Sequence, residues 1–529
     1  MIKTDIKVST DYTPDTVREA LRQRLPLTAE ELSDFEIVRR IVNIKDRGNI
    51  HYDMTVAISL SPEREAGLLK IRNKVKPHDP LTLEIPRARL TSRPVVVGAG
   101  PAGLFAALVL AEAGARPILI ERGLPVEERK KSVDLFNTLG LLDPDSNIQF
   151  GEGGAGTYSD GKLKVGSHDK YKMKVLRTLH ELGAPDEILF SMNGHLGTDK
   201  LSDLIRALRE RLISLGTTVL FATKLVGIDL KNNAVSATRV AKNGKIDVID
   251  TENVVLATGH SARDSFRILR DIGLPMEPRG FGIGMRIEHP REYTDRITYG
   301  GDTPAGLGAA SYHLVTHLPN GRSAYSFCMC PGGTVVAATS AQGGVVTNGM
   351  SEFGRDGDNS NAAFLVSLTP RDFGTDDPLG GFALQERIER AAFAAGGGDY
   401  RAPAIRMSDF LSDSTTTAPA SVRPSYPRGT TPARPSDYLP DFITDSLRAA
   451  IADFDAWMPG FSYPDAIMTG AETRSTSPVR ILRDDSLSAV GFDGIYPAGE
   501  GGGYSGGIIS SAADGVRVAI ALLEKYKID

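Results

Sequence analysis

A glycine-rich turn between an expected strand and an expected helix constrains this chain more than any other feature. Residues 95–103 read Val-Val-Val-Gly-Ala-Gly-Pro-Ala-Gly, a β-branched run that enters a Gly-x-Gly-x-x-Gly turn. An apolar helix is expected over 104–113, and a second strand over 117–120 ends at Glu121. A dinucleotide-binding βαβ unit has this order of parts: strand, glycine turn, helix, strand and acidic residue. The sequence therefore predicts such a unit.

Each part of this unit has a physical reason. Gly98 permits the tight turn, Gly100 lets the backbone approach a pyrophosphate, and Gly103 lets the helix pack closely on the strand. The helix N-terminus presents free N–H groups and partial positive charge to the phosphates. Glu121 is expected to accept hydrogen bonds from a ribose 2′-OH, and its charge argues against a 2′-phosphate.

The C-terminal region indicates which dinucleotide is bound. In residues 495–517 a short strand ends at Ala498, a turn at Gly499-Glu500 follows, and a glycine-rich loop then enters a helix with apolar residues at helical spacing. This order resembles the last strand–turn–helix of two-dinucleotide-fold flavoproteins. A helix N-terminus at the flavin pyrimidine ring would stabilise the anion formed on reduction. The resemblance implies FAD rather than NAD.

Two more segments fit the same cofactor. Residues 254–259 form a β run that ends in Ala-Thr-Gly, similar to the strand that returns to the FAD domain in the glutathione-reductase superfamily. Residues 151–161 are rich in glycine, as backbone that passes close to a planar ring or a phosphate often is.

The chain as a whole resembles the FAD-dependent dehydrogenases of bacteria and archaea whose substrate is unassigned. The motifs that carry this resemblance, besides the C-terminal glycine motif, are Glu-Gly-Gly-Ala-Gly at 152–156, Ser-Asp-Gly-Lys-Leu at 159–163, and the segments 257–264, 286–290, 327–333, 348–351, 472–474 and 477–481. The resemblance implies non-covalent FAD, and says little about the substrate.

The expected FAD contacts come from these glycine-rich and strand-end segments. They are Gly98, Gly100, Pro101, Ala102, Gly103, Glu121, Arg122, Gly153, Gly154, Ala155, Gly156, Ser159, Thr258, Gly259, Gly499, Glu500, Gly506, Gly507 and Ile508.

Composition excludes several other classes of protein. Apolar residues make up 41% and charged residues 24% of the chain, as in a soluble globular protein, and a net charge of −5 gives no reason to expect nucleic-acid or membrane binding. No run of apolar residues is long enough for a transmembrane helix, and the N-terminus is not a signal peptide. Only two cysteines occur, which excludes a disulfide framework and suits a cytoplasmic enzyme.

The expected fold class is α/β, with a Rossmann-like FAD-binding domain, an inserted α+β cap or substrate domain, and a small N-terminal α+β domain. The expected boundaries are 1–92 for the N-terminal domain, 93–280 and 465–529 for the FAD domain, with an excursion near 165–197, and 281–464 for the cap. No second Gly-x-Gly-x-x-Gly opens an apolar helix, so a separate NAD(P)H domain is not expected.

Two cysteines at 328 and 330 flank Met329 in an expected strand. On a regular strand such residues share a face with Cβ atoms roughly 6–7 Å apart, beyond the ~3.5–4.5 Å that a disulfide needs. Two buried thiols are the simpler interpretation, which predicts that reduction takes up two electrons, by flavin alone. A thiol near the flavin is the alternative and needs a backbone bent at 331–333. Two thiols are too few to bind a metal ion, and no metal site is expected.

The remaining catalytic candidates are polar residues near the expected flavin. His260 follows the Ala-Thr-Gly turn, where a loop hydrogen bond is the simpler role. Arg286 and His289 enter the cap domain, and Arg286 and Glu288 face one side of a strand, where they could pair with each other. Arg474 could hold a substrate carboxylate bidentately, or pair with Glu472 or Asp484.

The expected function is an FAD-dependent oxidoreductase that transfers a hydride between the flavin and a small organic substrate under the cap. One alternative is a flavin reductase or monooxygenase at which NAD(P)H docks transiently. A second is a non-enzymatic FAD-binding protein whose N-terminal module binds a partner. An electron-transfer protein is a further possible partner.

Overall fold

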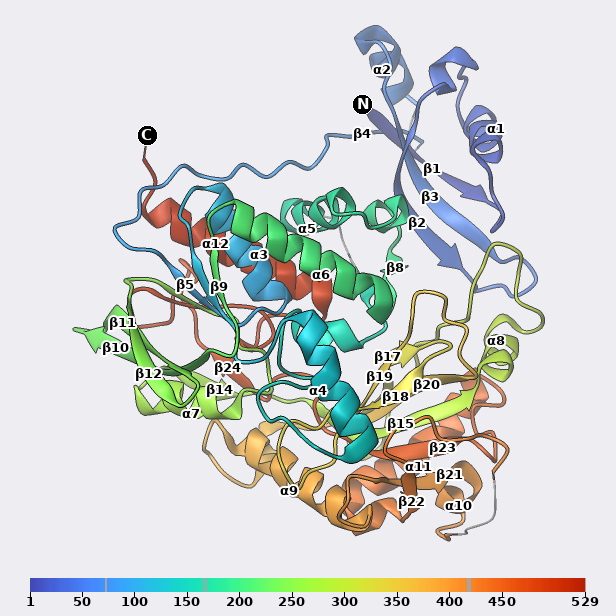
Figure 1. Ribbon diagram of the computed structural model, residues 1–529. Helices are drawn as coiled ribbons and strands as arrows, with labels where there is room; N and C mark the ends of the chain where they lie inside the picture. Colours follow the sequence, from blue (N-terminus) through green and yellow to red (C-terminus); the bar gives the residue numbers. More distant parts are fainter. Residues whose placement is uncertain (72–73, 165, 167–168, 416–419, 529) are drawn as a thin grey trace.

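The computed structural model describes residues 1–529 except 72–73, 165, 167–168, 416–419 and 529. Residue 165, where the excursion from the FAD domain was expected to begin, lies outside the described residues. The chain folds as an N-terminal domain, a parallel-sheet region and an antiparallel-sheet region (Figure 1).

The N-terminal domain is a four-stranded antiparallel sheet with two helices, and Figure 1 shows it standing apart from the rest of the molecule. Thr13 caps α1, and Pro14 occupies its first position, as is typical of helix N-termini. Thr28 and Glu31 form a capping box, but only a short 3₁₀ turn follows it. The elements are β1 (Ile2–Val8), α1 (Pro14–Arg24), η1 (Glu30–Leu32), β2 (Glu36–Asn43), β3 (His51–Ile58), α2 (Pro62–Leu69) and β4 (Lys76–Pro77), and the sheet order is β2-β3-β1-β4.

A strap without regular structure, residues 78–92, leads from this domain across the body. The Arg89 amide donates to the Tyr526 carbonyl oxygen at 3.0 Å, and the Ile528 amide donates to the Arg87 carbonyl oxygen at 3.1 Å. The strap is thereby bound to the C-terminal end of the chain.

The centre of the parallel-sheet region is a five-stranded sheet in the order β25-β13-β5-β6-β9. Every pairing in it is parallel. In chain order this is the doubly wound arrangement 3-2-1-4-5, which confirms the Rossmann-like prediction. The strands are β5 (Val95–Val97), β6 (Ile118–Ile120), β9 (Thr218–Leu220), β13 (Val254–Leu256) and β25 (Ile495–Pro497).

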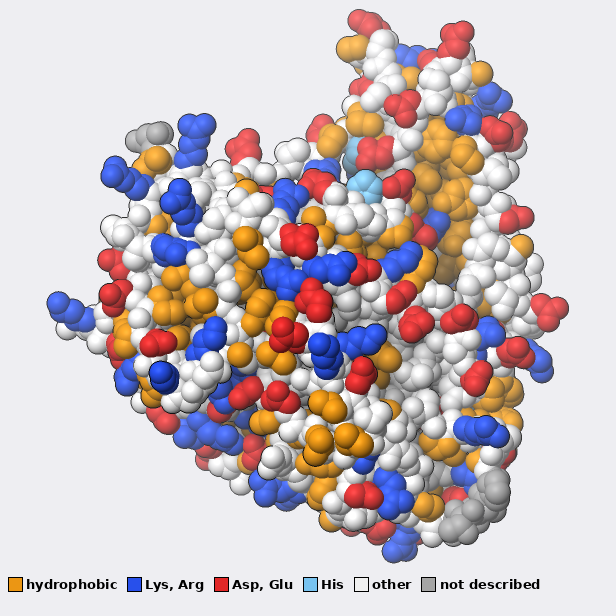
Figure 2. Space-filling model, viewed as in Figure 1, with side chains coloured by type: hydrophobic (Ala, Val, Ile, Leu, Met, Phe, Trp, Pro, Cys, Tyr) orange, Lys and Arg blue, Asp and Glu red, His pale blue; other side chains and the backbone are white. Residues whose placement is uncertain are grey.

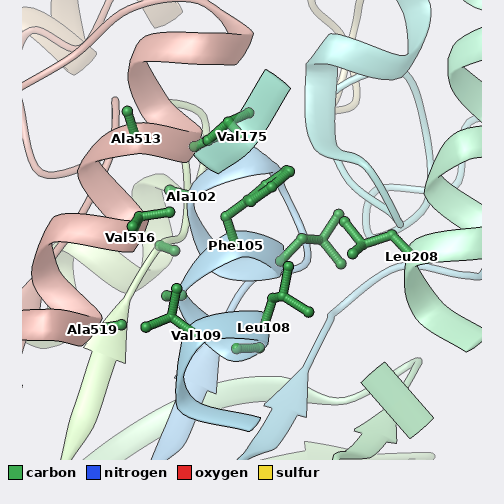
Figure 3. Packing of buried hydrophobic residues seen from close by; sticks show 14 of the residues in the cluster. Ala102, Phe105, Leu108, Val109, Val175, Leu208, Ala513, Val516 and Ala519 are labelled. Atoms are coloured by element: carbon green, nitrogen blue, oxygen red, sulfur yellow. The ribbon is translucent and has the colours of Figure 1, made fainter. Parts of the chain in front are cut away.

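Helix α3 (Pro101–Glu112) is buried along its length, because its side chains are apolar on every face. It begins three residues earlier than the apolar pattern alone predicts. Figure 3 shows Phe105 and Leu108 of α3 directed towards helices α5 and α6, with the C-terminal helix α12 on the other side. A Cβ at Gly515 would lie 2.0 Å from the Ala102 carbonyl oxygen, so this glycine permits the close crossing of α3 and α12.

The other elements of this region surround the sheet. They are α4 (Val126–Leu139), η2 (Gly154–Tyr158), β7 (Lys162–Lys164), α5 (Lys170–Glu181), η3 (Asp186–Leu189), β8 (Asn193–His195), α6 (Gly197–Ser214), the antiparallel sheet of β10 (Lys224–Lys231), β11 (Ala234–Lys242) and β12 (Lys245–Asp250), then α7 (Arg263–Asp271), β14 (Met276–Pro278), β24 (Val479–Ile481) and α12 (Ile508–Lys525).

The antiparallel-sheet region is built on a seven-stranded sheet in the order β16-β17-β20-β15-β23-β21-β22, with one parallel pair at its edge. Helices α9 and α11 supply apolar side chains to its core. β23 (Ile467–Glu472) belongs to this sheet, so the chain returns to the parallel-sheet side a few residues later than 465. The elements are β15 (Gly282–Pro290), α8 (Arg291–Tyr299), β16 (Val315–His317), β17 (Ser323–Cys330), β18 (Thr334–Ala337), β19 (Thr347–Met350), β20 (Asn359–Ser367), η4 (Pro370–Phe373), α9 (Gly380–Ala395), β21 (Ala402–Arg406), α10 (Met407–Leu411), β22 (Thr430–Pro432), η5 (Pro435–Asp437), α11 (Asp441–Trp457) and β23.

Lys and Arg alternate with Asp and Glu over the face seen in Figure 2, without a large area of one sign. Among the helices that the structure describes, none has both the length and the apolar character needed to cross a membrane.

Candidate functional site

One cavity lies at the carboxyl ends of the parallel strands. Residues at or just after the ends of β5, β6, β13 and β25 line it, among them Gly98, Glu121, Thr258 and Glu500. β5 stands between β6 and β13, so the cavity opens where the strand order reverses. Open α/β sheets bind their ligands at this position.

Two helices point their N-termini at this cavity. α3 begins at Pro101 and α12 at Ile508, and no side chain caps either helix. Both first residues line the cavity. The first-turn N–H groups and the positive dipole ends are therefore available to a negatively charged ligand.

The glycines of the site fall into two groups. A Cβ at Gly98 would lie 2.4 Å from the Ala257 carbonyl oxygen, and one at Gly103 would lie 1.8 Å from the Gly98 carbonyl oxygen. These two glycines are required by close packing of the protein itself. A Cβ at Gly100 would meet only the Gly154 Cα at 3.9 Å, and none of the described atoms lies within 4 Å of one at Gly259. Gly100 and Gly259 therefore leave space that a ligand can enter.

Glu121 has internal partners that the sequence did not reveal. Its carboxylate accepts hydrogen bonds from the backbone amides of Ala99 at 2.8 Å, Gly123 at 2.9 Å and Gly151 at 2.9 Å. It still lines the cavity, although its side chain is buried. Glu121 therefore joins the first glycine turn to the second glycine-rich loop, whether or not it also holds a ribose.

A buried arginine supports that second loop. The Arg129 guanidinium donates to the carbonyl oxygens of Asn147 at 2.8 Å, Ile148 at 2.9 Å and Glu152 at 2.6 Å. A Cβ at Gly151 would lie 2.4 Å from the Arg129 Cδ, which explains the glycine there. Arg129 was not among the predicted residues, because nothing in the local sequence of α4 links it to the loop.

The two cysteines do not lie on a regular strand, which corrects the sequence-based geometry. In the pairing of β17 with β20, Phe327 opposes Ala363 and Cys330 opposes Asn361, so two residues of β17 face one of β20. Cys328 has a left-handed backbone, with φ of 41°. This is a β-bulge, which re-aims the side chains beside it.

The bulge brings the two thiols together. The Cys330 thiol is buried and donates a hydrogen bond to the Cys328 carbonyl oxygen at 3.2 Å. Cys328 lines the cavity. The interaction between the two thiols, aided by the charge of Arg286, lowers the pKa of the Cys328 thiol, against the effect of burial.

Arg286 is buried and lies behind the cavity wall. Its guanidinium pairs with Glu472 at 2.6 Å and donates to the Cys328 carbonyl oxygen at 2.8 Å and to the side-chain oxygens of Asn348 at 2.9 Å and Asn361 at 3.1 Å. The expected pairing of Arg286 with Glu288 is wrong. Glu288 instead accepts hydrogen bonds from Ser425, in the loop before β22, and from Asn359 at the start of β20, the strand beside β15.

Arg474 forms an ion pair, but with neither of the expected acids. It binds Glu389 through two hydrogen bonds of 2.9 Å, and Arg263 binds the same carboxylate at 2.7 Å. Glu389 lies on α9, far away in the sequence. The two guanidinium groups hold the pKa of Glu389 at about 2 despite its burial.

Two titratable groups border the cavity beside this cluster. Burial lowers the pKa of His260 to about 4, with the charges of Arg474 and Arg263 acting in the same direction. Burial raises the pKa of Glu500 to about 8, although Arg279 opposes this. At neutral pH the imidazole is neutral and the carboxyl group is largely protonated.

His289 does not belong to the site. Its ring donates from Nε2 to the Phe461 carbonyl oxygen at 2.8 Å within the antiparallel-sheet region, and burial lowers its pKa to about 4. The prediction placed it near the flavin because it follows Arg286 closely. Side chains alternate across a strand, so Arg286 and His289, three residues apart on β15, point to opposite faces of the sheet.

Most of the predicted residues border the one cavity. They are Gly98, Gly100, Pro101, Ala102, Glu121, Arg122, Gly154, Ala155, Gly156, Ser159, Thr258, Gly259, His260, Cys328, Arg474, Glu500, Gly507 and Ile508. Seven do not line it: Gly103, Gly153, Arg286, His289, Cys330, Gly499 and Gly506. Arg122 also pairs with Asp264 at 2.8 Å. The lining residues that the prediction missed include Gln149, Phe150, Asp160, Lys162, Asn348 and Glu472.

The donor set fits FAD. A strand-end glycine turn and two uncapped helix N-termini supply N–H groups for phosphates, and Gly100 and Gly259 leave room for a close approach. Glu121, Gly151 and Gly154 would surround the adenosine and pyrophosphate portion, and Gly507 and Ile508 the flavin portion. Within the described residues, no group of His, Cys, Asp and Glu is placed to hold a metal ion.

Comparison with known proteins identifies the class. Residues 92–143 match an FAD binding domain, and residues 280–475 match the family "FAD-dependent protein, C-terminal domain-like". An uncharacterized protein of Clostridium beijerinckii is 39% identical over 528 residues, which cover 99% of this chain and 98% of that protein. The chain belongs to this family of FAD-dependent proteins, and its cofactor is FAD.

Solved structures that the chain matches include three at low sequence identity. A flavoprotein/dehydrogenase from Cytophaga hutchinsonii is 11% identical, with a TM-score of 0.37, over 83% of this chain and 80% of that one. An L-proline dehydrogenase from P. horikoshii is 14% identical, with a TM-score of 0.37, over 82% and 94%. An E. coli quinol fumarate reductase is 14% identical, with a TM-score of 0.36, over 82% and 69%.

Proposed function

We propose that this oxidoreductase transfers a hydride between FAD and a small organic substrate held at the junction of the parallel-sheet and antiparallel-sheet regions. Bound FAD would supply the two-electron chemistry. The observation that carries the proposal is the composition of the cavity wall. The glycine-rich backbone that would bind the nucleotide lines one part of the wall. Polar side chains of the antiparallel-sheet region, including Cys328, Asn348 and Glu472, line another part.

The second region would position the substrate. Glu472 and Asn348 are held by the buried Arg286, so their orientation is fixed before any ligand arrives. Lys162 also lines the cavity, and its ammonium group lies 3.8 Å from Asp160, whose carboxylate is mainly bound by Arg355. Lys162 is the most available cation for an anionic group of a substrate.

Proton movement would involve Glu500 and His260. Glu500 has a raised pKa of about 8, so it can donate a proton at neutral pH. His260 has a lowered pKa of about 4, so it takes part as a neutral imidazole. Its Nδ1 lies 3.1 Å from the Ser261 hydroxyl oxygen, which sets the ring orientation.

The proposal is tested by a screen of the FAD-loaded protein against metabolite mixtures without oxygen, with flavin absorbance as the readout. A small organic compound should bleach the flavin, or reoxidise it after dithionite reduction. Reduction by NADPH or NADH alone would favour the reductase or monooxygenase alternative. A flavin that no compound and no nicotinamide cofactor reduces or reoxidises would support a non-enzymatic role instead.

A further inference from the structure

We infer that Cys328 and Cys330 form a second two-electron centre, which cycles between a dithiol and a disulfide in exchange with the bound flavin. This inference rests on the proposed function, since it needs a flavin that accepts and donates electrons. It reverses the expectation from regular strand geometry that flavin alone takes up electrons.

The backbone at the two cysteines departs from a regular strand. A regular strand would keep the two side chains too far apart for a disulfide. Here the bulge between Phe327 and Cys330, with the left-handed Cys328, bends the chain at this point. A left-handed backbone is unfavourable for a residue other than glycine and persists only where its surroundings enforce it.

The surroundings do enforce it. A Cβ at Gly332 would lie 1.8 Å from the Arg355 carbonyl oxygen, and one at Gly333 would lie 2.2 Å from the Met350 carbonyl oxygen. The Pro-Gly-Gly segment therefore packs tightly against the end of β19 and the loop that follows it. On the other side, Arg286 donates to the Cys328 carbonyl oxygen.

The two thiols have different exposure. Cys328 lines the cavity, whereas Cys330 is fully buried behind it and donates to the Cys328 carbonyl oxygen. An accessible thiolate with a protected thiol beside it is the arrangement of an attacking and a resolving cysteine. Asn361 lies opposite Cys330 in the sheet, and its buried amide nitrogen has no hydrogen-bond partner among the described residues. Among the described residues it is an unpaired donor at the strand position opposite Cys330.

The reaction balances without another reactant. Reduction breaks the bond between the two sulfur atoms and takes two electrons and one proton from reduced FAD. The proton goes to Cys330, and Cys328 remains a thiolate. Oxidation is the reverse, with the two electrons and the proton returning to oxidised FAD.

Anaerobic dithionite titration of the FAD-loaded full chain tests the inference, combined with alkylation and mass measurement at each point. Wild type, oxidised beforehand with diamide, should take up four electrons per FAD, and two alkylated thiols should appear during the titration. Cys328→Ser and Cys330→Ser should each take up two. Met329→Leu is the matched control, because it changes the residue between the thiols, and it should take up four.

A second measurement does not depend on flavin chemistry. Diamide treatment of the cofactor-free wild type should remove both alkylation sites, and a dithiol should restore them. The chain has only two cysteines, so the label reports on this pair alone. Two electrons per FAD, with both thiols alkylated after diamide, would overturn the inference while leaving the proposed function intact. A flavin that takes up no electrons at all would instead overturn the proposed function.

Discussion

At the residue scale, the glycines of the nucleotide site illustrate what a motif encodes. Gly98 and Gly103 are required by neighbouring backbone, whereas Gly100 faces open space and has a φ of −77°, which any residue can adopt. The same motif therefore contains two glycines that the fold requires, Gly98 and Gly103, and one glycine, Gly100, that leaves space for a ligand. Substitutions should separate the two roles.

Gly100→Val should weaken FAD binding by at least tenfold, about 1.4 kcal/mol, with little change in the stability of the cofactor-free protein. The Cβ would enter the ligand space, where the nearest described protein atom is the Gly154 Cα at 3.9 Å. Gly98→Ala should instead lower the unfolding free energy itself, because its Cβ would clash with Ala257. Fluorescence titration with FAD and denaturant unfolding measure the two effects, with Gly67→Ala as the control. Unchanged FAD affinity in Gly100→Val would place the pyrophosphate elsewhere.

Glu121→Ala should affect both properties. We expect FAD binding to weaken by roughly 1–3 kcal/mol, the scale for lost hydrogen bonds to a charged group. The cofactor-free protein should also lose stability, since three backbone amides would lose their acceptor. Chemical denaturation without FAD measures this second effect. A variant with full apo stability would contradict the role of Glu121 as a link between loops.

At the element scale, the site depends on contacts between elements that are distant in the chain. Arg474 follows β23, Arg263 begins α7, and both bind Glu389 on α9. Local patterns predicted α3, α12 and the parallel strands β5, β6, β13 and β25, but not β9. They could not predict Glu389 or Arg129 as partners, because local patterns hold no information about which helix packs beside which loop. The bulge at Cys328 was missed for the same reason, since its cause lies in the loops that contact 331–333.

The Glu389 cluster gives a pH prediction. Its carboxyl pKa is lowered from 4.5 to about 2, so its contribution to stability is complete above pH 4.5 and is lost as the pH falls towards 2. At about 1.4 kcal/mol per pKa unit this contribution is about 3 kcal/mol. Glu389→Gln should be less stable at pH 7 and should show a shallower loss between pH 4.5 and 2. Parallel pH profiles of the two proteins would contradict this assignment.

The N-terminus of α12 gives a second prediction at this scale. Gly507 has a φ of 88°, which disfavours any β-branched side chain. Gly507→Val should shift the first N–H groups of the helix and lower the flavin midpoint potential, because the dipole stabilises the reduced, anionic flavin. Potentiometric titration measures the change. A variant that keeps both FAD and its potential would place this helix away from the flavin ring.

At the scale of the whole molecule, the N-terminal domain has its own apolar core. It contacts the body through Arg40, which pairs with Glu187 and exchanges backbone hydrogen bonds with Phe190 and Met192. The strap 78–92, in contrast, packs on the core that surrounds α3. The sequence predicted that the N-terminal domain extends to residue 92. In the structure the segment from residue 78 onwards packs on the core around α3, and not on the core of the N-terminal domain.

Truncation should reveal this difference. A chain that begins at residue 78 should bind FAD as the full chain does, because the strap and the cavity are retained. A chain that begins at residue 93 should be less stable, since Tyr526 and Ile528 lose their backbone partners in the strap. Thermal unfolding with and without FAD distinguishes them. Equal stability of the two truncated chains would show that the strap contributes nothing.

The most direct test of the central claim is the amount of FAD bound by the full chain after purification and reconstitution, measured by absorbance after acid release. We expect one yellow, non-covalently bound FAD per chain, held in the cavity and bound at least tenfold more weakly by Gly100→Val. A folded wild-type protein that stays colourless after incubation with FAD would contradict it.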